Sequence, residues 1–259
     1  MTSLSKSDPR DSRLRLATLV QRSLLPTRCP QCQCADMAVR YLMLEGVGGD
    51  FYEFISFDHG NQGFLIGDVA GHGVESALTM AWIVGYVRKA EAEHAGPAGL
   101  IADLRGLLAQ MDSEVASFCT AFYGIYDPSV RVLTYCNAGH PPPMLVHQSA
   151  DELTHLDSHC LLVGPLPEHN CDDLERHATV IPGDRLALYT DGLTEVFNAA
   201  GQQWGAERLS GSLLETRHLS ADKAAESILE RARSFAGTER FTDDVTLIVI
   251  DFPEGRTHA

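Results

Sequence analysis

The stretch GGDFYEFISFDHGNQGFLIGDVAGHG, residues 48–73, determines the fold that we expect for this chain. Two runs rich in aromatic and β-branched residues, 51–57 and 64–69, flank a polar turn, which is the pattern of a β-hairpin. In an antiparallel hairpin, the start of the first strand and the end of the second lie at the same edge of the sheet. We therefore expect Asp50 and Asp68 to lie within a few residues of facing each other.

The rest of the chain continues this pattern with further strands and with helices. Runs of strands interrupted by paired helices favour an α+β fold over alternating βαβ units. Residues 149–173 are weakly patterned and predict loops around a short strand. The spacing of apolar residues predicts further strands over residues 38–44, 120–126, 130–138, 185–190 and 245–252, an antiparallel helix pair over 75–93 and 99–116, and a C-terminal helix over 220–235.

An amphipathic helix is predicted near the N-terminus, over residues 13–25, and Pro26 ends it. Its periodicity shows an apolar face but not what covers that face. Two interpretations stay open, a lid packed on the domain and a surface for a dimer or a regulatory partner. We divide the chain into a flexible tail (1–12), a regulatory or linker helix (13–26) and the main domain (27–253).

The composition is that of an ordinary globular chain, with 44% hydrophobic and 21% charged residues among 259. A formal net charge of −15 argues against a nucleic acid as partner, because that binding rests on clustered Lys and Arg. No apolar run is long enough to span a bilayer, so we expect no membrane partner. The N-terminus lacks the features of a secretory signal, and we expect a cytoplasmic protein.

The seven cysteines are an odd number in a chain without an export signal, which favours reduced thiols over a disulfide framework. Cys29, Cys32 and Cys34, in CPQCQC, have the close spacing of zinc or redox thiols. A closed zinc site needs a fourth ligand, however, and no second CxxC follows. A metal or redox role and a loop with incidental thiols both stay open.

Aspartates stand at the ends of four predicted strands, most of them beside glycine: Asp50, Asp68, Asp191, and Asp243 with Asp244. One such aspartate is ordinarily a turn former or a helix cap, but four in the same kind of place favour a shared site. If Asp191 ends one strand and Asp243 begins its antiparallel neighbour, these two also gather at one edge. Like charges at such close range require cations between them.

The chemistry of this aspartate set favours two cations of Mg²⁺ or Mn²⁺ rather than zinc or copper, because the ligands are hard oxygen atoms. A pair of such ions can lower the pKa of a bridging water and neutralise phosphoryl oxygens. The sequence therefore predicts hydrolysis of a phosphate ester.

Seven stretches resemble, in their order along the chain, the metal-dependent protein phosphatases of type 2C. They are most similar to the bacterial branch that includes the sporulation stage II protein E and the stress-response sigma-regulator phosphatases. The resemblance implies two packed antiparallel β-sheets flanked by helices, with a centre of two Mn²⁺ or Mg²⁺ ions at one edge. The stretches are QRSLLP (21–26), VGGDFYEF (47–54), IGDVAGHGVESAL (66–78), FCTAFYGIYDP (118–128), NAGHPPP (137–143), LALYTDGLTEV (186–196) and TDDVTLIVI (242–250).

The resemblance also assigns roles at matching positions. Asp50 and Asp68 match carboxylates that bridge or support both ions, which places them in the catalytic set as well. Val69, directly after Asp68, would contribute its backbone carbonyl. Asp191 and Asp243 match ligands of the second ion.

Some positions depart from the family pattern or support it less directly. Asp244 belongs to the candidate metal site as a residue that supports the ligands, since relatives often carry Asn or Asp there. Eukaryotic members hold the phosphate with an Arg near the place where Leu44 and Glu45 stand. Their acid His follows the DG pair directly, where Ala70 stands here. His72 could protonate the leaving serine oxygen or could order the GHG turn.

Two further features carry expectations on the substrate side. His140, in NAGHPPP, is expected to hold a loop rather than to act on substrate. The block GPLPEHN, residues 164–170, departs from the family's usual ending of that segment, which leaves the substrate-side flap unassigned.

The aspartate set and the resemblance together predict a serine/threonine phosphoprotein phosphatase that forms no phosphoenzyme. Its substrate would be a phosphorylated protein, in this branch often an anti-sigma-factor antagonist of the STAS type. One alternative is a regulatory docking protein with the same fold and little catalysis, and the intact aspartate set counts against it. Another is a metal-dependent hydrolase of small phosphoesters, which only substrate profiling separates from the first.

Regulation is suggested by the helix that ends in QRSLLP, which in this branch usually joins an upstream sensor to the phosphatase. Only about a dozen residues precede the helix here, so we expect no fused sensor. Control would then come from an activator or from homodimerisation through residues 13–25.

Overall fold

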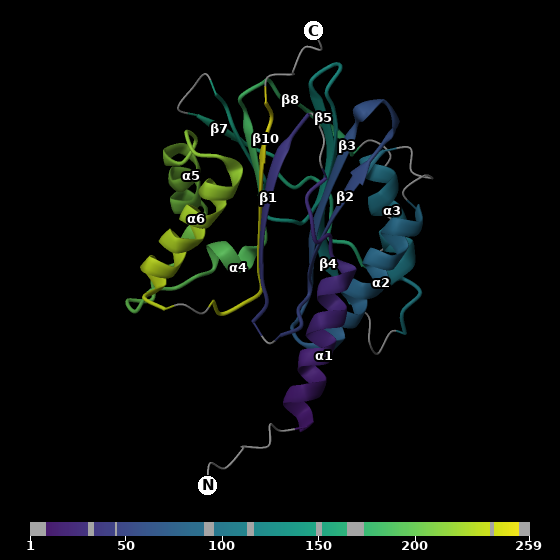
Figure 1. The fold of residues 1–259 in the computed structure, drawn as a ribbon. Helices are drawn as coiled ribbons and strands as arrows, with labels where there is room; N and C mark the ends of the chain where they lie inside the picture. The colour runs from purple at the N-terminus through teal and green to yellow at the C-terminus, as the bar shows by residue number, and fades with distance from the viewer. Residues whose placement is uncertain are drawn as a thin grey trace.

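Two five-stranded antiparallel β-sheets pack against each other, with helices on their outer faces (Figure 1). The structure is a computed structural model. It describes residues 9–30, 34–44, 46–90, 96–112, 117–148, 152–164, 174–238 and 241–253. The two sheets are the arrangement that the sequence predicted, and they bring the candidate site to one edge.

One sheet is built from the hairpin and the strands that follow it, and α2 (Val74–Ala90) and α3 (Pro97–Leu108) pack against it. The hairpin register pairs Asp50 directly with Asp68, as the sequence predicted. Both faces of this sheet are covered, so the inner strand that carries Asp68 is buried at nearly every residue rather than at alternate ones. In spatial order its strands are β2 (Asp50–Ser56), β3 (Gln62–Val69), β4 (Cys119–Asp127), β5 (Val132–Ala138) and β8 (Arg176–Thr179), with the short 3₁₀ helix η1 (Asp58–Gly60) in the hairpin turn.

The other sheet joins the N-terminal and C-terminal strands of the domain, and α5 (Gly205–Glu215) and α6 (Ala221–Ala236) cover its outer face. The short helix α4 (Asp191–Thr194) follows its central strand. In spatial order its strands are β1 (Asp36–Leu42), β10 (Val245–Asp251), β9 (Arg185–Tyr189), β6 (Met144–Val146) and β7 (Leu153–His155).

Apolar side chains fill the space between the sheets. Phe64 of β3 packs edge to face on Phe252, with ring centroids 6.5 Å apart, and Tyr126 lies 4.7 Å from the same ring. Burial of this kind is the main favourable term in folding. The core therefore fixes how the strand ends of the two sheets meet.

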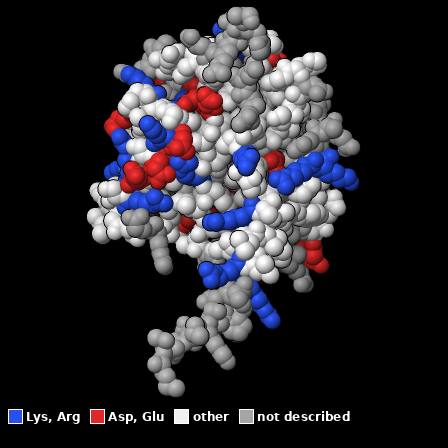
Figure 2. All heavy atoms as spheres, in the orientation of Figure 1, with Lys and Arg blue, Asp and Glu red and all other residues white. Residues whose placement is uncertain are grey.

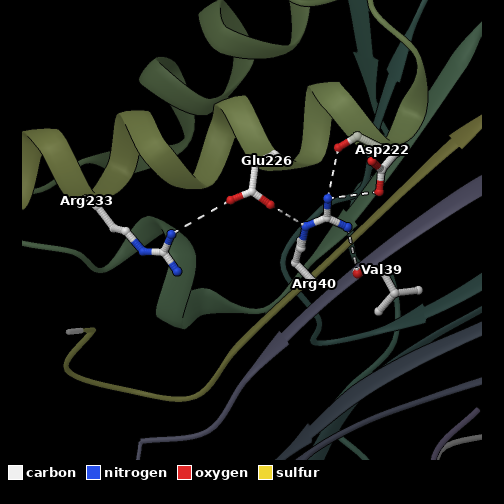
Figure 3. A network of polar contacts seen from close by, with 5 residues as sticks. All are labelled: Val39, Arg40, Asp222, Glu226 and Arg233. Atoms are coloured by element: carbon white, nitrogen blue, oxygen red, sulfur yellow. Dashed lines mark hydrogen bonds and ion pairs between the residues drawn. The ribbon is translucent and has the colours of Figure 1, made fainter. Parts of the chain in front are cut away.

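An ion-pair network fastens α6 to β1 on the outside of the molecule (Figure 3). Arg40 donates to Glu226 and to Asp222, each at 2.9 Å, and also to the carbonyl oxygen of Val39. Arg233 lies 4.0 Å from the second oxygen of Glu226. Figure 2 shows acidic and basic side chains intermingled over α5 and α6 on the face drawn there.

Several predicted bounds need correction. The first helix, α1, spans Pro9–Leu24 and so begins before residue 13. The strand expected over 130–138 begins at Val132, because residues 128–131 form a turn in which Arg131 takes a φ of 57°. The helix expected over 99–116 ends at Leu108.

Some elements were not predicted, and some predictions lie outside the described residues. The sequence reasoning missed β8, which is too short to show a period, and α5. Residues 1–8, Cys32, Glu45 and residues 165–173 lie outside the described residues, and with them most of the predicted tail and of GPLPEHN. Within the described residues, no helix combines the length and the apolar character that a membrane span requires.

Candidate metal centre

The hairpin supplies the first two carboxylates. Asp50 is the first residue of β2, and Asp68 is its register partner near the end of β3. Adjacent antiparallel strands place paired residues on the same face, so both side chains emerge together at this edge. Asp50 is 1% exposed, and Asp68 is half-buried.

The opposite sheet supplies the other carboxylates. β9 ends at Tyr189, and Asp191 follows directly after Thr190. Asp243 and Asp244 directly precede β10. The two strands are antiparallel neighbours, with Tyr189 paired to Leu247. The prediction that these strand ends gather at one edge is therefore confirmed.

Two threonines join the two sheets at this edge. Thr190 and Thr246 donate their hydroxyl hydrogens to Oδ2 of Asp50, at 2.8 Å and 2.7 Å. The Oγ1 of Thr190 also accepts the backbone N–H of Thr246 at 2.9 Å. The carboxylate of Asp50 is therefore held in orientation through its Oδ2.

Asp244 positions the loop that leads into β2. Its Oδ1 accepts the N–H of Leu44 at 2.8 Å, and its Oδ2 accepts the N–H of Gly49 at 3.0 Å. A Cβ at Gly48 would lie 2.0 Å from the same carboxylate, so only glycine fits there. Asp244 thus holds the backbone of the loop that leads to Asp50.

The carbonyl of Val69 faces the same loop. The backbone N–H of Val69 donates to the carbonyl oxygen of Gly49 at 3.3 Å. A Cβ at Gly49 would lie 2.6 Å from the carbonyl oxygen of Val69. The same Cβ would lie 3.1 Å from Oδ1 of Asp68. Glycine therefore leaves room beside two oxygen atoms that are both candidate ligands.

α1 contacts this loop through one buried polar side chain. Gln21 is 4% exposed, donates to the carbonyl oxygen of Gly48 at 2.6 Å and accepts the N–H of Gly48 at 3.0 Å. The apolar residues of the same helix lie outside, with Leu16 63% and Leu19 66% exposed. α1 is therefore connected to the site but keeps an uncovered apolar face.

The electrostatics show that the carboxylates converge. Burial, with Asp244 and Asp191 nearby, raises the pKa of Asp50 to about 7, although its two threonine donors act in the opposite direction. Burial and four neighbouring aspartates raise the pKa of Asp68 to about 9. Burial, Glu195 and Asp243 also raise the pKa of Asp191.

This donor set fits divalent cations of the hard type. Carboxylate and carbonyl oxygens are the ligands that Mg²⁺ and Mn²⁺ prefer, and mutually repelling carboxylates are stabilised by positive charge between them. The orientation of Asp50 by two hydroxyl donors is the kind of support that metal-ligating carboxylates receive.

The two histidines differ in exposure. His72 is exposed on the turn that follows β3, between Gly71 and Gly73, both of which have positive φ. His140 is 1% exposed, and its Nδ1 lies 2.8 Å from Oγ1 of Thr120. Burial lowers the pKa of His140 to about 3, so the ring is neutral and adds no positive charge at this edge.

The sequence reasoning missed four residues of this region: Thr190, Thr246, Gln21 and Gly48. A weak signal for the threonines was present, because each stands within two residues of a predicted ligand in YTDG and TDDVT. Cys29 and Cys34 are half-buried and pack against the core. Cys32 lies outside the described residues, so the structure does not test the metal or redox role considered for Cys29, Cys32 and Cys34.

Comparison with known proteins places these residues in a wider context. Residues 58–253 match the family model described as stage II sporulation protein E. The chain is also 27% identical over 241 residues to phosphoserine phosphatase RsbU of Bacillus subtilis (strain 168), a match that covers 92% of this chain and 70% of RsbU.

Solved structures share the fold. The SiaA-PP2C domain of Pseudomonas aeruginosa matches with a TM-score of 0.81 at 22% identity, covering 94% of this chain and 97% of that one. The catalytic domain of serine threonine protein phosphatase PstP, in complex with two manganese ions, matches with a TM-score of 0.60 at 15% identity, covering 85% and 99%. The predicted fold class, two antiparallel sheets flanked by helices as in type 2C phosphatases, is confirmed.

Proposed function

The chain belongs to the stage II sporulation protein E family, and from this premise we propose that it hydrolyses phosphoserine or phosphothreonine in proteins. It is then a protein-serine/threonine phosphatase, as the name of its relative RsbU suggests. The observation that carries the proposal is the meeting of Asp50 and Asp68 from one sheet with Asp191 and Asp243 from the other.

The residues that would hold two Mn²⁺ or Mg²⁺ ions are those that the sequence singled out. Asp50, Asp68 and the carbonyl of Val69 supply oxygen atoms from the hairpin, and Asp191 and Asp243 supply them from the opposite sheet. When bound, such ions provide a water of lowered pKa and neutralise the charge on the phosphoryl oxygens.

The remaining residues orient the ligands. Thr190 and Thr246 hold the carboxylate of Asp50, and Asp244 holds the backbone that carries Gly49. This support reduces the reorganisation that the site needs at the moment of reaction. Asp244 therefore contributes to the metal site by holding the backbone next to Asp50, and not as a direct ligand.

His72 is our candidate for the general acid, because it is exposed on the turn beyond Asp68. A phosphoserine needs a proton on its leaving oxygen, whereas p-nitrophenol leaves without one. His72→Gln should therefore slow hydrolysis of a phosphoserine peptide by on the order of 100-fold and hardly change that of p-nitrophenyl phosphate. Equal loss on both substrates would instead indicate that His72 orders the turn.

The substrate class follows from the family and from the chemistry of the site. Relatives of the RsbU kind suggest a phosphorylated signalling protein, and we propose an anti-sigma-factor antagonist of the STAS type. The same proposal places the protein in the cytoplasm. A purified STAS-domain phosphoprotein should be hydrolysed with a higher kcat/KM than small phosphoesters, and the reverse order would favour a small-molecule hydrolase.

The exposed apolar face of α1 is proposed as the surface for an activator or for a second copy of the chain. Leu16 and Val20 are 63% and 56% exposed, while Gln21 of the same helix contacts the loop before Asp50. Leu16→Asp or Val20→Asp should change the oligomeric state or the activity, and Arg15→Glu on the same helix is the control. Unchanged sizing profiles and rates in both variants would exclude this role.

The experiment that tests the phosphatase is hydrolysis of p-nitrophenyl phosphate and of phosphoserine peptides with Mn²⁺, Mg²⁺ or EDTA. Activity should depend on the metal and should be lost in Asp68→Asn and Asp191→Asn. A wild type that is inert with every metal and binds no Mn²⁺ by calorimetry would favour the docking-protein alternative. Inertness with Mn²⁺ binding intact would point to a missing activator.

A further inference from the structure

Three soft donor groups converge in a part of the fold that the phosphatase chemistry does not use. Cys136 lies on β5, and His159 and Cys160 lie in the segment between β7 and β8. The two Sγ atoms are 3.4 Å apart, and one ring nitrogen of His159 completes a set whose members all lie within 4.8 Å of one another. Thiolates and imidazole are the ligands that Zn²⁺ and similar ions prefer.

The backbone holds these donors in place through Asn137. Its carbonyl oxygen accepts the N–H groups of His159 and Cys160, at 3.2 Å and 3.1 Å, and its Nδ2 donates to the carbonyl of Leu156 at 3.0 Å. The segment is therefore fixed against the end of β5 without any ion. A backbone ordered in this way reduces the cost of bringing the ligands together around an ion.

Both ring nitrogens of His159 face backbone carbonyl oxygens. Its Nε2 lies 2.5 Å from the carbonyl oxygen of Leu174, and its Nδ1 lies 3.1 Å from that of Asp157. A neutral imidazole carries one N–H and can donate to one of these oxygens only. To bind an ion, the ring would shift so that the other nitrogen turns its lone pair from a carbonyl oxygen toward the two sulfurs. The first nitrogen would keep its N–H on a backbone carbonyl, as histidine ligands usually do.

We propose that Cys136, His159 and Cys160 form a binding site for one thiophilic divalent cation, with Zn²⁺ as the probe. Binding converts both thiols to thiolates, so two protons are released to solvent and the two negative charges balance the charge of the ion. Cys136 is fully buried and Cys160 is 9% exposed, and a neutral assembly suits that burial. The fourth position of a tetrahedral ion is filled by water.

A bound ion would stabilise the position of the segment between β7 and β8. The segment that carries His159 and Cys160 continues to Val163, which exchanges two backbone hydrogen bonds with Cys119 at 2.8 Å and 2.9 Å. Cys119 is in turn the register partner of Val69, beside the acidic edge. A bound ion would therefore hold the segment with His159, Cys160 and Val163 against β5, and this segment reaches the edge where the carboxylates lie. This effect does not depend on whether the proposed phosphatase is active.

The test uses Co²⁺ in place of Zn²⁺ on the reduced full-length protein, because thiolate ligands give Co²⁺ a near-ultraviolet charge-transfer absorption that carboxylates do not. We expect this absorption to saturate at one ion per chain, to be displaced by Zn²⁺ and to coincide with release of two protons on Zn²⁺ titration. Asp68→Asn should keep the signal, so its presence or absence is independent of the proposed phosphatase.

Matched variants separate ligation from folding. Cys160→Ser should remove the absorption, and His159→Gln, in a part-exposed position, should weaken Co²⁺ binding on the order of tenfold or more. Cys29→Ser, at a half-buried thiol elsewhere, should leave both unchanged. Wild type that binds Co²⁺ without charge-transfer absorption, or peptide mapping that finds Cys136 joined to Cys160 as a disulfide in the reduced preparation, would overturn the proposal.

Discussion

The strand pair β9 and β10 carries carboxylates at both of its ends, and the two ends are built in opposite ways. At one end Asp251 faces its register partner Arg185, with N–O distances of 2.6 Å and 2.9 Å. At the other end Asp191 and Asp243 face further carboxylates and raise the pKa of Asp68. A carboxylate that has its own guanidinium is neutralised within the chain, and removing one partner is strongly destabilising. A group of carboxylates that repel one another is suited to bind cations.

The paired end is complete within the chain. The guanidinium of Arg185 also donates to the carbonyl oxygens of Thr216 and Leu219, at 3.0 Å and 2.6 Å. The same contrast exists along β2, where Glu53 pairs with Arg88 at 2.6 Å only three positions from Asp50. Burial alone therefore does not mark a functional carboxylate. The identity of its partners does.

The largest effect should come from breaking the paired end. Arg185→Met leaves Asp251 without its cation and removes a donor from the carbonyls of Thr216 and Leu219, and should lower the free energy of unfolding by about 3 kcal/mol. Urea unfolding in EDTA measures this. Adding Asp251→Leu should restore part of the loss, and a loss below about 1 kcal/mol would contradict the structural role of the pair.

The opposite end should respond in the opposite sense. Asp68→Asn should reduce Mn²⁺-dependent phosphatase activity at least about 100-fold, because it removes a proposed ligand. In EDTA the variant should melt no lower than wild type, since losing one carboxylate relieves repulsion among the others. If the metal-free variant melts well below wild type instead, Asp68 is part of a structural network like that of Asp251.

The third prediction concerns whether the ring of His140, near the acidic end, carries a positive charge. Burial lowers its pKa to about 3, so the folded state favours the neutral ring and its contribution is complete above the unfolded pKa of about 6.5. That contribution is lost as the pH falls, by about 2 kcal/mol at pH 5.

The measurement compares unfolding free energies of wild type and His140→Asn at pH 7.5 and pH 5. Taking the difference between the two proteins removes the opposing contribution of the buried carboxylates, which both share. Wild type should lose more stability than the variant on acidification. An equal loss would mean that folding does not lower the pKa of the ring.

The smallest effect should come from the hydroxyls that orient Asp50. Thr246→Val removes one of two donors and should weaken Mn²⁺ binding about tenfold, with a stability change of about 1 kcal/mol. Calorimetric titration measures it. Thr134→Val on β5 is the control, because that hydroxyl contacts His177 on β8. A similar loss of affinity there would exclude a specific role for Thr246.

Much of the fold could be predicted because the relevant signals are local. The runs that flank the hairpin turn fixed β2 and β3 and, through antiparallel geometry, the pairing of Asp50 with Asp68. The pairing of β9 with β10 was only supposed from the sequence, and the register shows it. Short elements such as β8 were missed because four residues show no period.

The candidate site was predictable to the same extent and no further. Asp191 and Asp243 were found because each stands at a strand end, whereas Gln21 was not, because nothing near it in sequence indicates that it contacts Gly48. The division of the chain into tail, helix and domain stays a prediction, as do the roles of the ligands.

The sequence by itself determined which aspartates stand at strand ends and which strands form hairpins, since both depend on neighbours a few residues away. Only the tertiary structure decided that Thr190 and Thr246 donate to Asp50, over separations of 140 and 196 residues, and that Cys136 touches Cys160. Such contacts depend on how the apolar core packs one sheet against the other, and the local spacing of apolar residues does not predict that packing.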